Sequence, residues 1–134
     1  MALNFGVNYL AVVVATVVAF AIGFVWYGMV FSRQWSAAYN MTPQQMRPQG
    51  AGAIAAIVAP LLDSWVLAVL SLSLGAKSIG DAVVVGFLVW LGFFAPQLGA
   101  NTAFQRRPWS LFAIDGAHAL VVQLVIAAVV TLWR

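Results

Sequence analysis

Residues 110–130 read SLFAIDGAHALVVQLVIAAVV, an almost wholly apolar stretch. At a rise of about 1.5 Å per residue, roughly 20 residues cross the hydrocarbon core of a bilayer as a helix, so this stretch is long enough to span a membrane. Two ionisable residues interrupt it, Asp115 and His118, the latter the single histidine of the chain. An aspartate at the centre of a spanning helix costs about 2.5–3.5 kcal/mol, so such residues are usually paired, line a cavity or serve a function.

The composition of the whole chain favours an integral membrane protein. The 134 residues are 64% hydrophobic and 7% charged, and the mean hydropathy is +1.00. A soluble domain carries about 25% charged residues. We therefore interpret residues 1–134 as a single membrane domain. The six basic residues form no basic stripe, so we expect no nucleic-acid partner. The absence of cysteine excludes disulfides and thiolate chemistry.

Four apolar segments are each long enough to cross a bilayer, at about 5–31, 51–76, 79–104 and 109–133. Their apolar runs are continuous, whereas strands of a membrane barrel alternate between lipid-facing and lumen-facing residues. The links after the second and third segments are short, which favours antiparallel neighbours. We predict an all-α fold, a four-helix antiparallel transmembrane bundle. No basic region precedes the first segment, so we interpret it as a retained span rather than a signal peptide.

The link over residues 32–50 is the longest and carries helix signals. Trp35 and Tyr39 are four residues apart, which suits aromatic anchoring at the membrane interface. Thr42, Pro43 and Gln45 have the pattern of a capping box with proline at the first helical position. These signals predict a short interfacial helix between the first two spans, and an ordinary loop is the alternative.

Basic residues are distributed unequally between the two ends of the predicted bundle. Because cytoplasmic loops carry an excess of lysine and arginine, the end with more of them should be cytoplasmic, with both termini outward. That end carries Arg33, Arg47, Arg106 and Arg107, and the other end carries Lys77 and Arg134.

Small residues recur every four positions along three of the spans. Such stripes let helix backbones approach closely in lipid. They could pack the bundle internally or form a homo-oligomer, and we expect a homo-oligomer or a larger membrane complex. The stripes are Ala11, Ala15, Ala19 and Gly23; Ala51, Ala55 and Ala59; and Ala95, Gly99 and Ala103.

Polar and amphipathic side chains from three spans fall at similar depth in the Arg-rich half of the bundle. Asp115 lies about 9 Å from the midpoint of the fourth span, and His118 is one turn deeper. Pro60 and Pro96 should loosen the helices nearby and free backbone carbonyls. The predicted pocket-lining residues are Trp26, Tyr27, Gln97, Asn101, Asp115 and His118, with Asp63 near the midpoint of the second span.

Two structural alternatives explain Asp115 and His118 without a functional pocket. In the first, Asp115 caps a helix that begins at Gly116, since residues 116–133 still cross about 27 Å. In the second, the polar groups hydrogen-bond to one another and fix helix register, at about 0.6 kcal/mol for each bond.

The residues offer no complete catalytic set. Zinc needs three or four ligands, and His118 with Asp115 and Asp63 is a weak set. Ser110 is about two turns from His118, too far for a nucleophile and its base. We therefore expect no catalytic residue, no metal and no cofactor.

The spans offer no convincing internal repeat of the kind found in many transporters, because spans 1–2 and spans 3–4 are not alike. The main hypothesis is a non-enzymatic membrane protein that binds or transports a small molecule or ion, with a proton relay through Asp115 and His118 as one form of it. The alternative is an accessory or assembly subunit of a larger membrane complex. Membrane lipids are expected partners in either case.

Several stretches resemble one family of small bacterial membrane proteins, domain of unknown function 1761. They are NYLAVVVATVVAFAIGFVWYGMVF over 8–31 with Trp35 after it, GFLVWLGF over 86–93, FQRRPWSLFAIDGAHALV over 104–121 and the terminal LW over 132–133. The resemblance covers nearly the whole chain and implies a four-span fold in a bacterial inner membrane. It implies no activity. The chain has Gly28 and Met29 where the family usually has serine-proline, and Gln105 in place of a glutamate.

Overall fold

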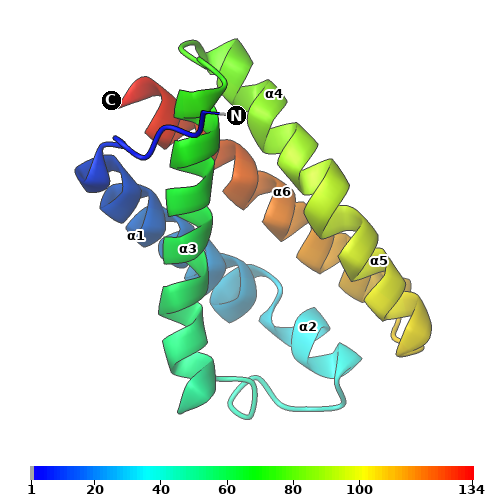
Figure 1. Ribbon diagram of the computed structural model, residues 1–134. Helices are drawn as coiled ribbons and strands as arrows, with labels where there is room; N and C mark the ends of the chain where they lie inside the picture. The colour runs from blue at the N-terminus through cyan, green and yellow to red at the C-terminus, as the bar shows by residue number, and fades with distance from the viewer. Residues whose placement is uncertain (1) are drawn as a thin grey trace.

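The computed structural model describes residues 2–134 as a set of apolar helices with no strand among those residues (Figure 1). Four helical rods are long and apolar enough to cross a membrane, so the prediction of an all-α transmembrane bundle is confirmed. The elements are α1 (Tyr9–Val25), η1 (Trp26–Val30), α2 (Ser32–Ala38), α3 (Ala51–Ser73), α4 (Ile79–Val89), η2 (Trp90–Phe94), α5 (Ala95–Phe104) and α6 (Trp109–Leu132).

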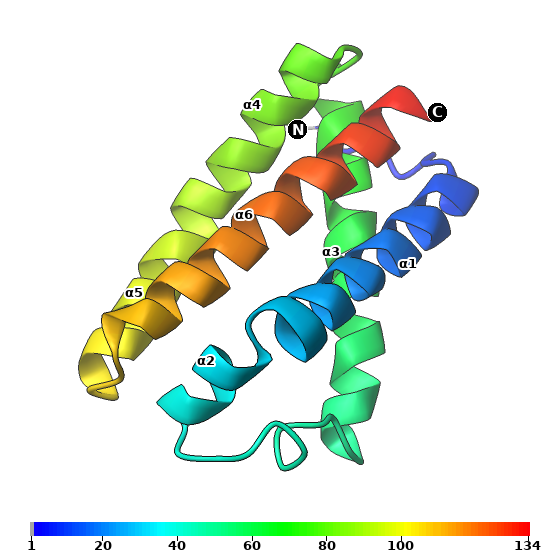
Figure 2. The same ribbon diagram turned by 180° about the vertical axis from the view of Figure 1, so that it is seen from behind.

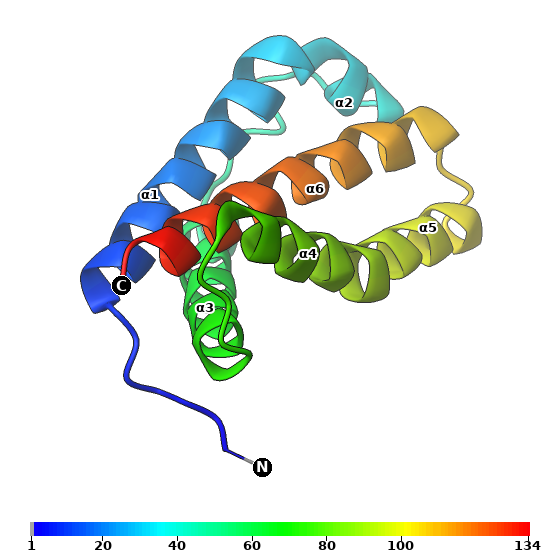
Figure 3. The same ribbon diagram turned by 90° about the horizontal axis from the view of Figure 1, so that it is seen from above.

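The last span, α6, is the central helix of the bundle. It contacts α1 and α3 on one side and the continuous rod formed by α4, η2 and α5 on the other (Figures 2 and 3). It has ten buried residues, whereas α1 and α3 have five each. A residue that α6 presents to a neighbour therefore lies inside the protein rather than in lipid.

Helix ends follow local capping signals. Asn8 accepts hydrogen bonds from the backbone of Leu10 and Ala11, so α1 begins at Tyr9, later than the predicted start at residue 5. Residues 2–8 run as a non-helical segment beside α3, where Asn4 N–H donates to Ser73 Oγ. The start of α4 is likewise capped, because Ser78 and Asp81 form a capping box there.

The link between α1 and α3 contains a helix, as predicted, but at a different place. The helix is α2, which includes Trp35, whereas the predicted capping box lies beyond it. Thr42 and Gln45 do exchange the two capping-box hydrogen bonds, at 2.8 and 3.3 Å. Only a single turn follows, over residues 43–46, because no apolar face continues it into a longer helix.

Two π-helical turns occur in the rods, η1 at the end of the first rod and η2 within the third. In η1 the Phe31 N–H donates to the carbonyl of Trp26, and in η2 the Ala95 N–H donates to the carbonyl of Trp90. The second π turn lies directly before Pro96, which has no N–H to continue the helical ladder. The expected loosening at Pro96 thus takes the form of a π turn, whereas α3 runs unbroken through Pro60.

The small-residue stripes differ in what covers them. Those of α1 are buried within the protein, at Ala11, Ala15 and Ala19. The closest approach uses a glycine outside the predicted stripes, Gly86 of α4. A β-carbon added there would lie 2.8 Å from the backbone oxygen of Gln123 in α6. The stripe of α3 is exposed at Ala51, Ala55 and Ala59.

Candidate functional site

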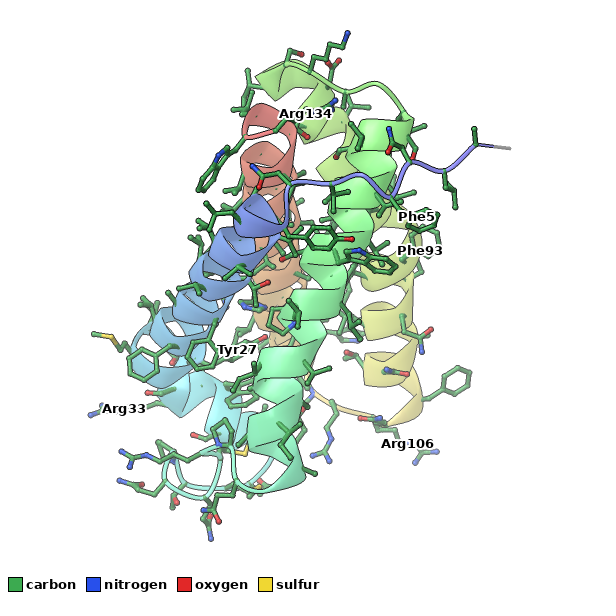
Figure 4. All side chains as sticks on the ribbon, turned by 60° about the vertical axis from the view of Figure 1, so that its left-hand side comes forward. Phe5, Tyr27, Arg33, Phe93, Arg106 and Arg134 are labelled. Carbon is green, nitrogen blue, oxygen red and sulfur yellow. The ribbon has the colours of Figure 1, made fainter. Side chains whose placement is uncertain are left out.

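Tyr27 of η1 and Asp115 of α6 meet in the half of the bundle that carries Arg33 and Arg106 (Figure 4). The Tyr27 hydroxyl donates to Asp115 Oδ1 at 2.6 Å, and both side chains are half-buried. The distance is in the range of a charge-assisted O–H···O⁻ bond. Because α6 begins at Trp109 and is helical through Asp115, the alternative in which Asp115 caps a helix from Gly116 is wrong.

His118 lies one turn further along α6 and completes the cluster. Its ring packs 4.8 Å from the Tyr27 ring and 6.0 Å from the Trp26 ring, centroid to centroid. The Nε2 atom is buried and has no hydrogen-bond partner among the described residues. It faces Gly23 of α1, where an added β-carbon would lie 3.5 Å away. The cluster therefore contains an unused imidazole nitrogen beside a hydrogen-bonded carboxylate.

The backbone on either side of Asp115 is held by two tryptophans. The indole N–H of Trp26 donates to the carbonyl of Ile114 at 3.1 Å, and that of Trp90 donates to the carbonyl of Gly116 at 2.9 Å. Each tryptophan is the first residue of a π turn. Single π turns are rare in proteins, and those that do occur are often found at functional sites. Here they aim the two indoles at the turn of α6 that bears Asp115.

The role of Trp90 was missed in the sequence, although a signal for it exists. Residues 25–28 read VWYG and residues 89–92 read VWLG. Both stretches form π turns that begin at the tryptophan, so spans 1 and 3 share a local motif that a comparison of whole spans overlooked. Searching for short repeats rather than repeated halves would have placed Trp90 beside Trp26 as a candidate.

A row of aromatic side chains leads from the cluster to the Arg-rich end. Tyr27 packs on Trp35 at 4.5 Å, and Trp35 on Tyr39 at 6.1 Å. The Arg107 guanidinium lies 4.7 Å above the Tyr39 ring and donates to the carbonyl of Ala38. Burial raises the pKa of Tyr39, and the negative charge of Asp115 raises it further, whereas Arg107 lowers it. The row therefore joins an acidic group inside the bundle to a basic one at its end.

Asp63, also predicted to line the pocket, lies at a separate place. Its carboxylate accepts a hydrogen bond from Gln123 Nε2 where α3 crosses α6, at 2.5 Å. Gln123 is eight residues beyond Asp115 along α6, a rise of about 12 Å. Asp63 and Asp115 therefore belong to separate polar sites of the bundle.

Gln97 and Asn101 lie apart from both sites. The Gln97 side chain donates to Asn101 Oδ1 at 3.4 Å, and both residues are exposed. The side of α5 that faces α6 is marked by Gly99, whose added β-carbon would meet the Phe112 ring at 3.4 Å. Residues two positions before and after Gly99 point roughly the opposite way on a helix. The depth of these two residues agrees with that of Asp115, but their direction does not.

Among residues 2–134, no group of three or more histidine, cysteine, aspartate or glutamate side chains could hold a metal ion.

A family model described as protein of unknown function (DUF1761) matches residues 10–131. The chain belongs to the DUF1761 family. No curated protein and no solved structure matches this DUF1761 protein. The family match confirms the resemblance drawn from its sequence, and the four apolar helices make it a multi-pass membrane protein.

Proposed function

We propose that this DUF1761 protein binds or transports a small molecule or ion at the cluster of Tyr27, Asp115 and His118, and that it is not an enzyme. The observation that carries the proposal is the Tyr27–Asp115 hydrogen bond beside the unpartnered Nε2 of His118. Polar and ionisable groups inside a membrane are expensive and mark ligand or ion pathways. An acceptor carboxylate and a free imidazole nitrogen one turn apart can bind a small polar group together.

The size of the ligand follows from how tightly the cluster is filled. Two hollows in the surface lie along the outer face of α1 and beside the N-terminal segment, and neither is lined by Asp115 or His118. Tyr27, Trp26 and Gly23 of the first rod already approach the His118 ring. The proposed ligand is therefore an ion or a molecule of a few atoms rather than a drug-sized compound.

Native mass spectrometry of the full chain, released from a mild detergent, tests this proposal. We expect bound small species on the wild-type protein that are lost or weakened in Asp115→Asn and in His118→Phe. Gln97→Leu is the matched control, because Gln97 is polar but exposed on the side of α5 opposite to Gly99, which faces α6. Identical spectra for the wild type, Asp115→Asn and His118→Phe would reject the proposal.

The proposal includes an orientation in the bacterial inner membrane, with the end that carries Arg33 and Arg106 in the cytoplasm. Arg134 lies at the opposite end of the bundle (Figure 4). Because the chain has no cysteine, single cysteines can report the topology. We expect Gln49→Cys to be protected from a membrane-impermeant thiol reagent in intact cells and Ser78→Cys to be labelled. The reverse pattern would overturn the orientation.

A second function, as a subunit of a homo-oligomer or of a larger membrane complex, is favoured by the first half of α3. Its small-residue stripe is exposed, and so are the large side chains of Ile54, Ile57 and Leu62. Small stripes support close helix contacts in lipid. We expect Ala55→Cys to form disulfide-linked species under oxidising conditions in membranes, with Phe20→Cys on α1 as the control. Equal cross-linking at both positions would count against a specific interface.

A further inference from the structure

A second polar site lies near the middle of the bundle, where α3 crosses α6. Asp63 is the thirteenth of the 23 residues of α3, close to the midpoint of that span. Gln123 of α6 donates to Asp63 Oδ2 and is 1% exposed. A neutral amide satisfies one lone pair of the carboxylate, but it leaves the negative charge in place.

No fixed positive charge of the described residues lies close enough to cancel the charge of Asp63. The helices packed on α3 are α1, α4 and α6. Their titratable side chains are Tyr9, Asp81, Asp115 and His118, and none of them makes a hydrogen bond to Asp63 within residues 2–134. Arg134 bonds to the carbonyl of Ser71, eight residues and about 12 Å further along α3.

Two buried oxygens without a partner among the described residues belong to residues next to Asp63, one by hydrogen bond and one in the chain. They are Oε1 of Gln123, which belongs to the amide already in contact with Asp63, and Oγ of the neighbouring Ser64. Ser64 is 0% exposed. Buried polar atoms are almost always hydrogen-bonded, so these two unpartnered oxygens indicate a place for a bound ligand. Carboxylate, amide and hydroxyl oxygens are hard donors that suit a small cation.

We propose that Asp63, Gln123 and Ser64 form a binding site for an exchangeable small monovalent cation, a proton or an alkali metal ion such as Na⁺. One carboxylate supplies one negative charge, which a single positive charge balances. Calcium takes six to eight oxygen ligands and commonly several carboxylates, so a divalent ion fits this site poorly. This site is independent of the proposed function at Asp115, since the two differ in depth and in partner helix.

Thermal unfolding of the full chain in a mild detergent tests the site. The midpoint is measured against Na⁺ concentration, with N-methylglucamine keeping the ionic strength constant, and separately against pH. A ligand that binds the folded state raises the midpoint by mass action. We expect an increase of about 4 °C or more at saturating cation. A response to Na⁺ identifies an alkali ion, and a midpoint that rises as proton concentration rises identifies a proton.

Asp63→Asn assigns the response to the site, because it removes the charge and keeps the shape. We expect it to abolish the response, whereas Asp115→Asn keeps it. If Asp63→Asn does not fold, Gln123→Met decides: it removes the unpartnered oxygen, and the response should then need at least tenfold more cation. The proposal is overturned if the wild type responds to neither cation. It is equally overturned if Asp63→Asn, or Gln123→Met in its place, responds as the wild type does.

Discussion

Tyr27 and Asp115 are 88 positions apart in the chain, and their side chains meet at 2.6 Å across the contact between the first and last spans. The bond lies at the turn of α6 whose carbonyls are held by Trp26 and Trp90. One short segment of α6 is thus fixed to the first and third rods through side-chain hydrogen bonds. The two ionisable residues of this apolar stretch therefore lie where polar side-chain contacts join three segments of the bundle.

Removing the Tyr27 hydroxyl should destabilise the protein. Tyr27→Phe leaves the half-buried carboxylate of Asp115 without this donor, and we expect a loss of about 1–2 kcal/mol in the free energy of unfolding. Unfolding of the full chain in mixed micelles measures it. The control is Tyr9→Phe, since Tyr9 is exposed and should change little. Equal stability of Tyr27→Phe and the wild type would contradict the importance of this bond.

Adding a methyl group at Gly86 should force α4 away from α6. The added carbon would lie 2.8 Å from a backbone oxygen of Gln123, which cannot rotate aside, so we expect Gly86→Ala to cost about 1–3 kcal/mol. Gly52→Ala is the control, because Gly52 has open space around it and alanine favours a helix more than glycine does. The same unfolding measurement should show that Gly86→Ala is clearly less stable than Gly52→Ala. The opposite order would show that the contact between α4 and α6 at Gly86 is loose.

Removing either indole N–H should loosen α6 around Asp115. We expect Trp26→Phe and Trp90→Phe each to lose about 0.5–1.5 kcal/mol of stability. Amide hydrogen exchange of α6 near Ile114 and Gly116 should quicken in both variants. The control, Trp109→Phe, alters an exposed tryptophan at the start of the same helix. Unchanged exchange in Trp26→Phe and Trp90→Phe would indicate that the indoles do not hold this turn.

Removing the charge of Arg107 should raise the pKa of Tyr39 further. Burial already raises that pKa, and the guanidinium above the ring opposes the rise by stabilising the phenolate. Alkaline titration followed by ultraviolet absorbance measures it, with Tyr39→Phe assigning the signal. Arg107→Gln should shift the titration upward, and the exposed Arg106→Gln should leave it unchanged. A downward shift in Arg107→Gln would contradict the geometry.

The raised pKa of Tyr39 also predicts a pH dependence of stability. The folded state holds the phenolic proton more tightly than the unfolded chain does. This contribution to stability is therefore fully present below the ordinary tyrosine value of about 10 and is lost as pH rises through the higher value of the folded state. The unfolding midpoints of the wild type and of Tyr39→Phe, measured as pH rises above about 10, isolate the contribution of Tyr39 to stability. We expect the midpoint of the wild type to fall more steeply. A steeper fall for Tyr39→Phe would be the contrary result.

The fold and part of the site could be predicted from the sequence because bilayer thickness sets the length of each span. Depth along a helix follows from residue number, which correctly placed Tyr27 level with Asp115 in neighbouring spans. Depth says nothing about direction around the helix. Gln97 and Asn101 have the expected depth but point away from α6. Asp63 instead accepts a hydrogen bond from Gln123, at the place where α3 crosses α6.

The π turns account for what periodicity could not show. A helical pattern assumes a constant angle between residues, whereas a π turn spaces its bond over five residues. A helix face assigned from regular spacing in the sequence is therefore wrong for the residues that follow Trp26 or Trp90 in the same helix. The π turn at Trp90 has a visible cause in Pro96, but residues 26–30 contain no proline, so its counterpart at Trp26 had to be seen in the structure.

The shared VWxG turns of spans 1 and 3 also affect how the chains of this family should be aligned. Each turn accommodates one residue more than a regular α-helix would. A relative one residue shorter at this point would carry a straight helix in which the later side chains keep their directions, because the π turn absorbs the extra residue. An alignment gap beside these tryptophans would then mark the loss of a π turn, while the aligned residues on both sides of the gap keep the same faces.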